Sequence, residues 1–595
     1  MGVFRLLNHR YFTIFALVIM TYILGAQSDA YFKWTKPSNN QLHAINSDGC
    51  GYYAYLPQVF VHKTKHFEFH ATIQKRYPTS KFFQGLSPGE GNRMHDKYFV
   101  GTAVCMAPLF LVADQVTRWT GGVADGYSIL YEVSVLLSAI AFWLLGAISL
   151  LVLLKRMGIS NFPILVVIAG LTFATNLNFY IVYDIAFSHA YTFGLVAFFV
   201  LQCHLYVENS KVKHVIWIGF LIGLIVLIRP TNGIFLLIFP FLFPSFRAFW
   251  SRMKWMFVHQ KTGLFLALCC FVGLLFLQFW NIRSQYGFWG FNAYSAEGFD
   301  FLLEPKITEV LIGFRKGFFV YTPYMLIFIP GLVVLFRSNR YLFWGVFVVT
   351  SLFIYIMASW WCWYYGGSLG MRPMIDMYAI LAIPMVFFVT RLRQIGVACL
   401  IVFTGCMIYF NLVLNYQMLH AILHFSEMNK ERFFQVLLQT DDRFKFVFFT
   451  DNPTLDRKQF VVNQSYTVNN GKWCLAKKPT KNAGSLFPSL VVVPDSALAS
   501  SSIAVDLSYR FRVNMDEAIP KAILFGYTKG IREEVSIHFM GPQVPSLNQY
   551  YPIHAPLASM RTYGEFDSLE VVIEHGESIG TAQFVHCEIG QLKRN

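Results

Sequence analysis

The sequence predicts a mostly α-helical bundle that crosses a membrane about eleven times and is followed by a C-terminal β-sandwich domain. Hydrophobic residues make up 55% of the 595 residues and charged residues only 14%, a balance typical of a polytopic membrane protein. Long apolar runs recur up to residue 415, whereas the chain beyond is polar and mixed. The net charge of +15 does not indicate a nucleic-acid partner, because much of the Lys and Arg stands in short loops between apolar runs.

Apolar runs set the predicted helices, since about 17 to 25 apolar residues in a helix cross a bilayer. Runs near this length predict membrane-spanning helices at 11–27, 129–154, 162–181, 189–207, 215–229, 232–246, 262–281, 318–336, 341–359, 375–390 and 395–415. One more apolar run, 98–116, contains Pro108 and Asp114. We interpret it as a juxtamembrane or re-entrant helix that does not cross.

The basic loops between these helices predict how the protein lies in the membrane. With a cytoplasmic N-terminus and a retained first helix, all of them fall on the cytoplasmic side, as the positive-inside rule requires: 155–156, 211–213, 247–261, 337–340 and 391–393. The outer side then receives the first loop, 28–128, the turn 183–189, the loops 282–317 and 360–373, and the C-terminal part.

The C-terminal part divides into two predicted segments. Residues 416–450 form a connector that includes an amphipathic helix, and residues 451–595 show short alternating runs separated by Gly, Pro, Asn and Asp, as in a β-sandwich. The ten cysteines show no CxxC pair or zinc spacing. Cys474 and Cys587 lie in the exported domain and could be joined in an oxidising compartment.

Asp48 is the first candidate functional residue. It stands in the segment SDGCGYYAYLP, residues 47–57, with Tyr52 and Tyr53 close behind it. Gly49 and Gly51 would let the backbone approach a ligand closely. A lone carboxylate in such a setting indicates chemistry at the membrane surface, and an ordinary surface turn is the alternative.

Cations recur at the outer rim of the predicted bundle, where Arg and Lys are normally scarce. They are Arg229 in IRPTN, Arg315 and Lys316 in FRKG ahead of Tyr321, and Arg372 in MRPMID. Arginine binds phosphate oxygens bidentately and keeps its charge, so their recurrence predicts an anionic ligand such as a lipid phosphate. Unrelated cations that reach up from helix ends are the alternative.

Further outward residues are candidates for substrate binding. Asp184 and His189 could polarise a sugar hydroxyl or hold a metal, although a histidine satisfied at the interface is the favoured interpretation of His189. Trp363 and Tyr364, in WWCWYYGG, suit a wall against sugar or isoprenoid, or an aromatic belt at the interface.

Taken together, SDGCGYYAYLP, IRPTN, FRKGFFVYTP and WWCWYYGGSLGMRPMIDMY resemble bacterial membrane glycosyltransferases of the GT-C superfamily. That group is related to protein O-mannosyltransferases and the lipid A aminoarabinose transferase, and the Bacteroidetes-type members are most similar. The resemblance covers roughly residues 1–440. It implies a bundle in a bacterial inner membrane, with a first outer loop folded into juxtamembrane helices and a catalytic acid in that loop. The alternation of the helices across this membrane then predicts that the C-terminal domain is periplasmic.

The resemblance also implies an inverting transfer of sugar from a polyprenyl-phosphate donor to a glycan, lipid or protein acceptor. Matched residue by residue, Asp48 is the general base on the acceptor hydroxyl. The donor phosphate would be held by Arg229, Arg315, Lys316, Tyr321 and Arg372. The substrates would contact Tyr52, Tyr53, Asp184, His189, Trp363, Tyr364 and Asp376.

One departure from that group and two other functions stay open. Ser-Asp-Gly stands where several members carry paired acids, which leaves open whether Mg²⁺ or Mn²⁺ is bound; Asp96 and Asp184 are the candidate second acids. A transporter or flippase for a lipid-linked anion would also need cations at the rim, but such proteins usually carry ionisable residues near the midplane, which are few here. A membrane scaffold would leave Asp48 unexplained.

Overall fold

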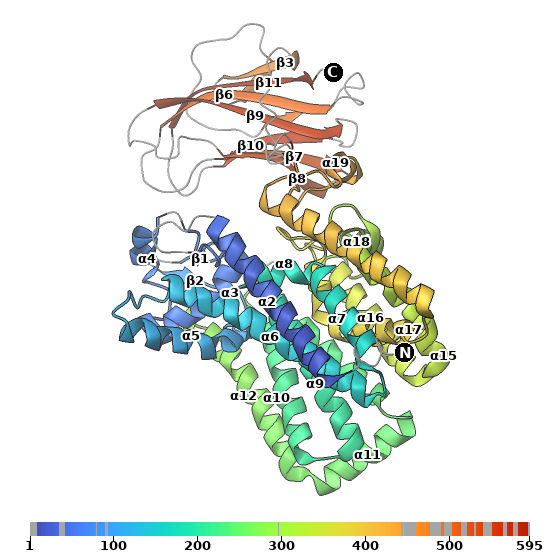
Figure 1. Cartoon of the computed structure of the whole chain (residues 1–595). Coiled ribbons are helices and arrows are strands. Elements are labelled where there is room, and N and C mark those ends of the chain that lie inside the picture. Colours follow the sequence, from blue (N-terminus) through green and yellow to red (C-terminus); the bar gives the residue numbers. More distant parts are fainter. Residues whose placement is uncertain are drawn as a thin grey trace. The chain divides into compact units, whose positions relative to one another are not determined.

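The structure is a computed structural model that describes residues 9–34, 42–78, 80–89, 93–294, 297–441 and 444, and nine strands between residues 460 and 592. The chain forms two units. The first comprises Met1–Leu419 and Phe425–Thr440 and is helical; the second comprises His420–His424 and Asp441–Asn595 and contains the strands (Figure 1).

The helical unit begins with a membrane helix and a folded first loop (Figure 1). These elements are α2 (Arg10–Trp34), α3 (Asp48–Leu56), the π-helix η1 (Pro57–His62), α4 (His70–Arg76), the short strands β1 (Ser87–Pro88) and β2 (Met94–His95), and α5 (Gly101–Trp119). The bundle continues with α6 (Ile129–Arg156), α7 (Asn161–Phe173), α8 (Leu177–Val182), α9 (Ser188–Asn209), α10 (Val212–Ile228), the 3₁₀ helix η2 (Pro230–Leu242), α11 (Phe246–His259) and α12 (Lys261–Tyr286).

The rest of the helical unit contains two more 3₁₀ helices between α-helices. In order these are α13 (Ile307–Ile312), α14 (Phe318–Tyr321), η3 (Pro323–Ile327), α15 (Phe328–Ser338), α16 (Arg340–Ala358), η4 (Arg372–Met377), α17 (Tyr378–Val389), α18 (Gln394–Leu419) and α19 (Lys430–Val436).

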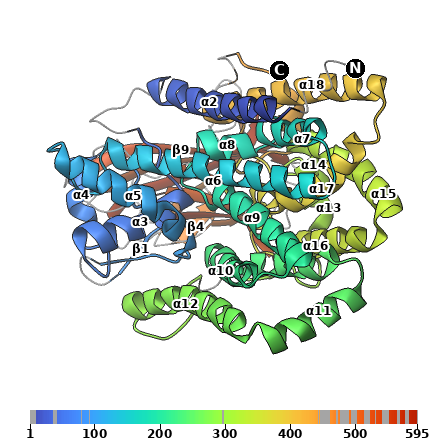
Figure 2. The same cartoon turned by 60° about the horizontal axis from the view of Figure 1, so that its bottom comes forward.

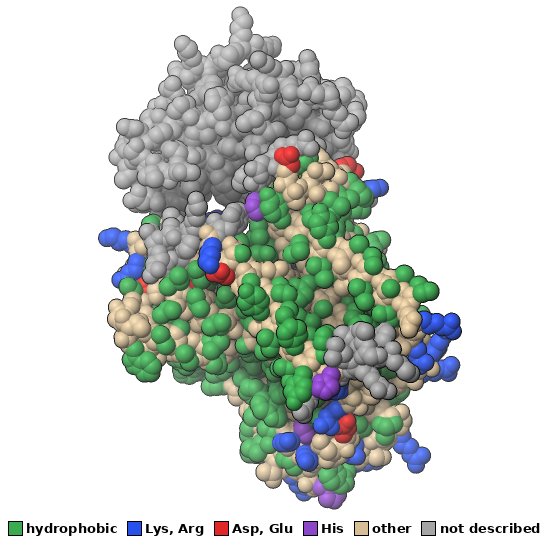
Figure 3. All heavy atoms as spheres, viewed as in Figure 1, with side chains coloured by type: hydrophobic (Ala, Val, Ile, Leu, Met, Phe, Trp, Pro, Cys, Tyr) green, Lys and Arg blue, Asp and Glu red, His purple; other side chains and the backbone are tan. Residues whose placement is uncertain are grey.

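The protein is a multi-pass membrane protein. In the described part of the chain, seven helical segments are long and apolar enough to cross a bilayer: α2, α6, α9, α12, α16, η4 with α17, and α18. The pair η2 and α11 passes the same test but is bent by 104° at its break, and α7, α10 and η3 with α15 are shorter apolar helices. Apolar side chains accordingly cover much of the visible face of the bundle (Figure 3).

All eleven predicted runs are helical, but two are broken where the sequence predicted a continuous helix. The run 162–181 is divided into α7 and α8, and Asn176 in the break donates its side-chain N–H to the carbonyl of Leu369, 3.0 Å away. The run 318–336 is divided at Pro323, which has no N–H to continue a helical ladder. The run 98–116 becomes α5 and is not among the candidate spans of the described residues.

Helix α9 is the centre of the bundle and packs against α6, α10 and α17 (Figure 2). Helix α9 is largely buried. Helix α12 packs against α10, but most of its residues are not buried in the protein. Close backbone approach fixes α5 on α10, because a Cβ on Gly101 would lie 2.4 Å from the backbone nitrogen of Ile228. The first loop is thereby fastened to one end of the bundle.

The strands of the second unit form two antiparallel sheets, which confirms the predicted β domain. One sheet has the order β5-β10-β7-β8 and the other β4-β3-β11-β6-β9. The strands are β3 (Phe460–Asn469), β4 (Lys472–Leu475), β5 (Leu490–Val492), β6 (Ser502–Arg512), β7 (Lys521–Thr528), β8 (Ile531–Phe539), β9 (Tyr550–Thr562), β10 (Ser568–Glu574) and β11 (Thr581–Leu592). The side chains of Cys474 and Cys587 lie outside the described ones, so their pairing stays a prediction.

The connector differs from the predicted single amphipathic helix. Helix α18 continues to Leu419, and the next helix, α19, covers only Lys430–Val436. Asn429 caps α19, because its side-chain oxygen accepts a hydrogen bond of 2.8 Å from the backbone N–H of Arg432.

Candidate active site

Asp48 lies where three separate segments meet. It is the first residue of α3, and its Oδ2 atom is 2.6 Å from the Nη2 atom of Arg372 in η4. Its Oδ1 atom accepts a hydrogen bond of 2.8 Å from the hydroxyl of Tyr98, just ahead of α5. The Asp48 side chain keeps 24% of its surface exposed, so one carboxylate is held by two partners and still reaches solvent.

The surroundings of Asp48 favour its charged form. Burial raises the pKa of Asp48, but the Arg372 charge and the hydrogen bonds from Tyr98 and Arg372 outweigh it and hold the pKa below its ordinary value. Asp48 is therefore ionised at neutral pH. An ionised carboxylate with partial exposure can accept a proton or a hydrogen bond from a bound molecule.

Arg372 uses only part of its hydrogen-bonding capacity. Its Nε and Nη1 atoms are buried and have no hydrogen-bond partner among the described residues, although a guanidinium carries five N–H donors. The guanidinium carbon lies 4.9 Å from the centroid of the Phe187 ring, in the turn before α9. Unused donors on a buried cation are suited to a second anion beside Asp48.

Asp376, one turn after Arg372, makes a second buried charge cluster. Its Oδ1 atom is 2.8 Å from Nδ1 of His189. Its Oδ2 atom accepts hydrogen bonds from Nδ2 of Asn232 at 2.8 Å and from Nη1 of Arg229 at 3.3 Å. Asp376, His189 and Asn232 are almost fully buried. The cluster joins η4 to α9 and η2 and fixes the direction of Arg229.

We expect the Asp376→Asn variant to lose about 3 kcal/mol of unfolding free energy, because the Arg229 guanidinium, whose side chain is only 17% exposed, would lose its counter-charge. A denaturant titration in detergent measures this loss. The double variant Asp376→Asn with Arg229→Gln removes both charges and should recover part of it. Equal stability of the wild type and Asp376→Asn would show that the pair does not hold η4.

The two candidate second acids have different surroundings. Asp184 forms a side-chain hydrogen bond with Asn46, and burial raises the pKa of Asp184 to about 7 despite the opposing charge of Arg372. Asp96 is buried, its Oδ1 accepts from the backbone N–H of Tyr98 at 2.9 Å, and burial raises its pKa well above the ordinary range. In the described ranges, no three His, Cys, Asp or Glu side chains gather as a metal site.

Arg315, Lys316 and Tyr321 lie in a separate cluster, next to the loop that leads into η4. Arg315 donates from Nε to the carbonyl of Ser426 at 2.9 Å, and its guanidinium lies over the Tyr364 ring, 3.4 Å from the centroid. The Lys316 amine donates to the carbonyls of Ser368 and Phe425, and burial holds its pKa well below the usual range. Tyr321 donates to the carbonyl of Phe314 at 2.9 Å. Trp363 also borders this cluster, 5.9 Å from the Arg315 guanidinium carbon.

The glycines of α3 serve packing against protein, which differs from the predicted approach to a ligand. A Cβ on Gly49 would lie 2.6 Å from Cβ of Ala186, and one on Gly51 only 2.1 Å from the Tyr98 ring. Both glycines therefore let α3 lie directly against its neighbours.

The two tyrosines that follow Asp48, Tyr52 and Tyr53, have different surroundings. Tyr52 packs edge-on against Tyr98 beside Asp48, with 4.9 Å between ring centroids. Tyr53 is fully buried and donates its hydroxyl to the carbonyl of Gly126, so it holds the first loop together.

Sequence reasoning missed three residues of the site. Tyr98 begins the ambiguous run 98–116, Asn232 ends the RPTN motif, and Phe187 lies between the predicted residues Asp184 and His189. Only Asn232 could have been found from the sequence, because it follows Arg229 in the same polar segment between two apolar runs. The other two act through contacts with residues distant in the chain.

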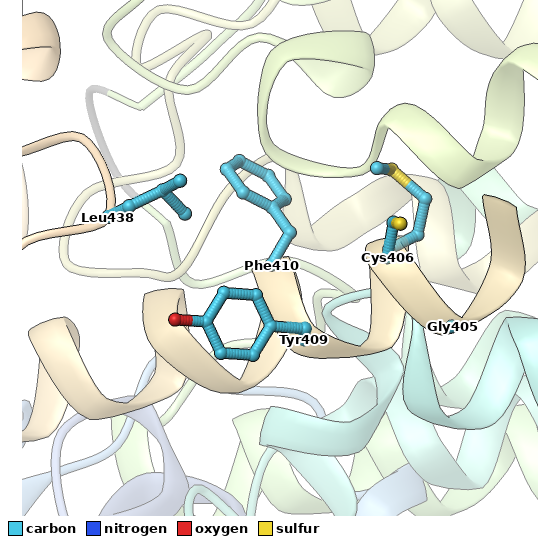
Figure 4. A pocket seen from close by; sticks show the side chains of 6 residues that line it. Gly405, Cys406, Tyr409, Phe410 and Leu438 are labelled. Atoms are coloured by element: carbon cyan, nitrogen blue, oxygen red, sulfur yellow. The ribbon is translucent and has the colours of Figure 1, made fainter. Parts of the chain in front are cut away.

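An apolar surface cavity lies elsewhere, along α18 (Figure 4). It has a volume of about 440 Å³ and is lined by Gly405, Cys406, Met407, Tyr409, Phe410 and Leu438. Figure 4 shows Tyr409 and Phe410 projecting from the helix with Leu438 across from them. None of the candidate site residues lines it.

No protein-family model and no curated protein matches the sequence. Among solved structures, the chain is similar to the arabinosyltransferase EmbB from Mycobacterium smegmatis, with a TM-score of 0.34 and 10% identity over 96% of this chain and 64% of that chain. The chain thus spans less than two thirds of that enzyme's length.

Proposed function

We propose that this protein is a membrane glycosyltransferase that moves a sugar from a polyprenyl-phosphate donor to an acceptor hydroxyl on the outer side of a bacterial inner membrane. The observation that carries the proposal is the shared Arg372. One of its nitrogens holds the ionised Asp48, while its Nε and Nη1 are buried without partners. A proton acceptor therefore lies beside two unused donors of a cation, and transfer from a phosphate leaving group requires both a base and a cation of this kind.

The proposed reaction is an inverting displacement. The acceptor oxygen attacks the anomeric carbon of the sugar while Asp48 takes its proton. The bond from that carbon to the phosphate oxygen breaks, and its electron pair stays on the departing polyprenyl phosphate. Arg372 binds the phosphate and stabilises the charge that develops there. Sharing Arg372 with the phosphate also weakens its hold on Asp48, which makes the carboxylate a stronger base when donor is bound.

The other candidate residues take supporting roles in this proposal. Arg229 adds positive potential to the phosphate site, with its direction set by Asp376. Asp184 and Tyr52, which lie beside the Asp48–Arg372 pair, contact the sugar or the acceptor. Arg315, Lys316 and Tyr321 already donate to backbone carbonyls, so we assign them to holding the loops around the donor, with Trp363 and Tyr364 along the lipid chain.

The orientation of the protein in the membrane is also part of the proposal. The basic loops between the helices favour a cytoplasmic face opposite the first loop, so Asp48 would face the periplasm together with the C-terminal domain. The acceptor is then a glycan, lipid or protein of the cell envelope.

Purified protein tests the proposal directly. In detergent with a panel of radiolabelled polyprenyl-phosphate sugars and an envelope extract, we expect label to pass from one donor to an acceptor. In liposomes, movement of intact donor across the membrane without transfer would instead identify a flippase. Binding of no donor in any condition would overturn the proposal.

A further inference from the structure

Helix α11 has the composition of a helix that lies in the membrane surface. Its sequence, FRAFWSRMKWMFVH, carries Arg247, Arg252 and Lys254 and no acid. It begins after a bend of 104° from η2, so it runs across the direction of that helix. A helix that turns across its neighbour, with aromatic and basic residues, is typical of the interface between lipid tails and headgroups.

The side chains of α11 divide into stripes along the helix. Met253 and Met256 are buried against the protein. Phe246, Trp250 and Phe257 project on a second stripe and are 62%, 53% and 63% exposed. At about 100° per residue, Arg247 and Lys254, seven positions apart, form a third stripe beside the aromatic one. Aromatic side chains can therefore enter the lipid while both cations stay at headgroup level.

Positive charge at this end of the bundle is not balanced by the protein. No Asp or Glu stands between Glu208 and Glu297, and the exposed Lys211, Lys213 and Lys261 begin the neighbouring helices. Among described residues, Glu208 is already paired with Arg156 and His204. Lys and Arg side chains gather at the lower end in Figure 3, where Figure 1 has α11.

Arg252 adds an unused donor on the opposite flank of α11. Its guanidinium carbon lies 6.0 Å from the centroid of the Trp255 ring, and its Nη1 atom is buried without a hydrogen-bond partner among the described residues. A phosphate oxygen is the natural partner for such a nitrogen.

We propose that α11 is a docking surface for anionic lipid, with headgroup phosphates held by Arg247, Lys254 and Arg252. The exposed aromatic stripe anchors the helix among the acyl chains. Net positive charge without acidic partners makes the surface selective for phosphatidylglycerol-type headgroups over zwitterionic ones. This surface is independent of the proposed sugar transfer. In the predicted membrane topology it lies on the cytoplasmic side, opposite the first loop.

Lipid titration followed by native mass spectrometry tests this surface on the full chain in neutral detergent. Wild-type protein should bind phosphatidylglycerol about tenfold more tightly than phosphatidylcholine. The double variant Arg247→Gln with Lys254→Gln should lose about tenfold in phosphatidylglycerol affinity and keep its affinity for phosphatidylcholine. Equal affinity of the wild type for both lipids would overturn the proposal.

A matched control removes the same charge elsewhere. Lys75 and Lys81 are exposed residues of the first loop, so Lys75→Gln with Lys81→Gln lowers the net charge equally. We expect it to bind both lipids as the wild type does, and an equal loss in this control would show that only total charge matters. If the α11 variant does not fold, a salt series on the wild type decides: phosphatidylglycerol binding should weaken with salt, and salt-insensitive binding would contradict the proposal.

Discussion

Asp48→Asn should slow sugar transfer by about a thousandfold while the protein folds and binds donor as before, because general base catalysis contributes about 10²- to 10⁴-fold. The amide keeps the shape of the side chain but cannot take the acceptor proton. Turnover of a radiolabelled polyprenyl-phosphate sugar by wild type and variant measures the effect. Donor binding, measured separately, shows whether the loss lies in the chemical step.

Two control variants distinguish the role of Asp48 as general base from the effect of losing any carboxylate and from the effect of its hydrogen-bond partner. Asp29→Asn removes an exposed carboxylate that pairs with Lys33 on α2, and we expect wild-type turnover. Tyr98→Phe removes one hydrogen bond from Asp48 but leaves the carboxylate, so turnover should fall by only about tenfold. An active Asp48→Asn enzyme would remove Asp48 from the role of base.

The Arg372→Gln variant should bind donor about 10- to 100-fold more weakly, because charge-assisted hydrogen bonds to the phosphate would be lost. Its pH profile should change as well. Arg372 holds the pKa of Asp48 below its ordinary value, so in the wild type activity is retained until the pH falls below that lowered pKa. Without the cation, burial raises the pKa of Asp48, and the acidic limb of the profile moves to higher pH.

Arg118→Gln provides the matched control for Arg372→Gln. Arg118 is an arginine near the end of α5 whose carboxylate partner is Asp114. Donor KM and the acidic limb should stay at wild-type values in this variant. An unshifted acidic limb in Arg372→Gln, with normal folding, would mean that Asp48 is not the group whose ionisation limits the rate.

The sequence was informative about helices because the lipid environment demands long apolar runs. Each of the eleven predicted runs is helical, and the polar end is built of strands. The breaks inside 162–181 and 318–336 were not anticipated. In the first, a side-chain hydrogen bond from Asn176 to Leu369 in a distant loop accompanies the interruption, and such a contact cannot be seen in local hydropathy.

The charged residues of the candidate site were predictable, but neither their pairing nor the neighbours Tyr98 and Phe187 were. Asp48 and Arg372 stood out as a carboxylate and a cation among unusual neighbours, yet only the folded chain brings them to 2.6 Å. Equally, the sequence predicts Lys316 as a phosphate ligand but not that its amine donates to the carbonyls of two distant residues. The sequence shows which side chains are charged but not which groups they pair with, because the partners of buried charges come from distant segments of the chain.

The short helix η4 connects two parts of the molecule through opposite charges on neighbouring turns. Arg372 holds the first loop through Asp48, and Asp376 holds the bundle through α9 and η2. In the proposed reaction, a phosphate that draws Arg372 toward itself would weaken the contact of η4 with the first loop and leave the Asp376 contacts with the bundle in place. The proposed reaction would then follow a compulsory order, in which the lipid-linked sugar enters first and the acceptor is admitted only afterwards. Hydrolysis of the donor by water, in the absence of an acceptor, would be limited in the same way.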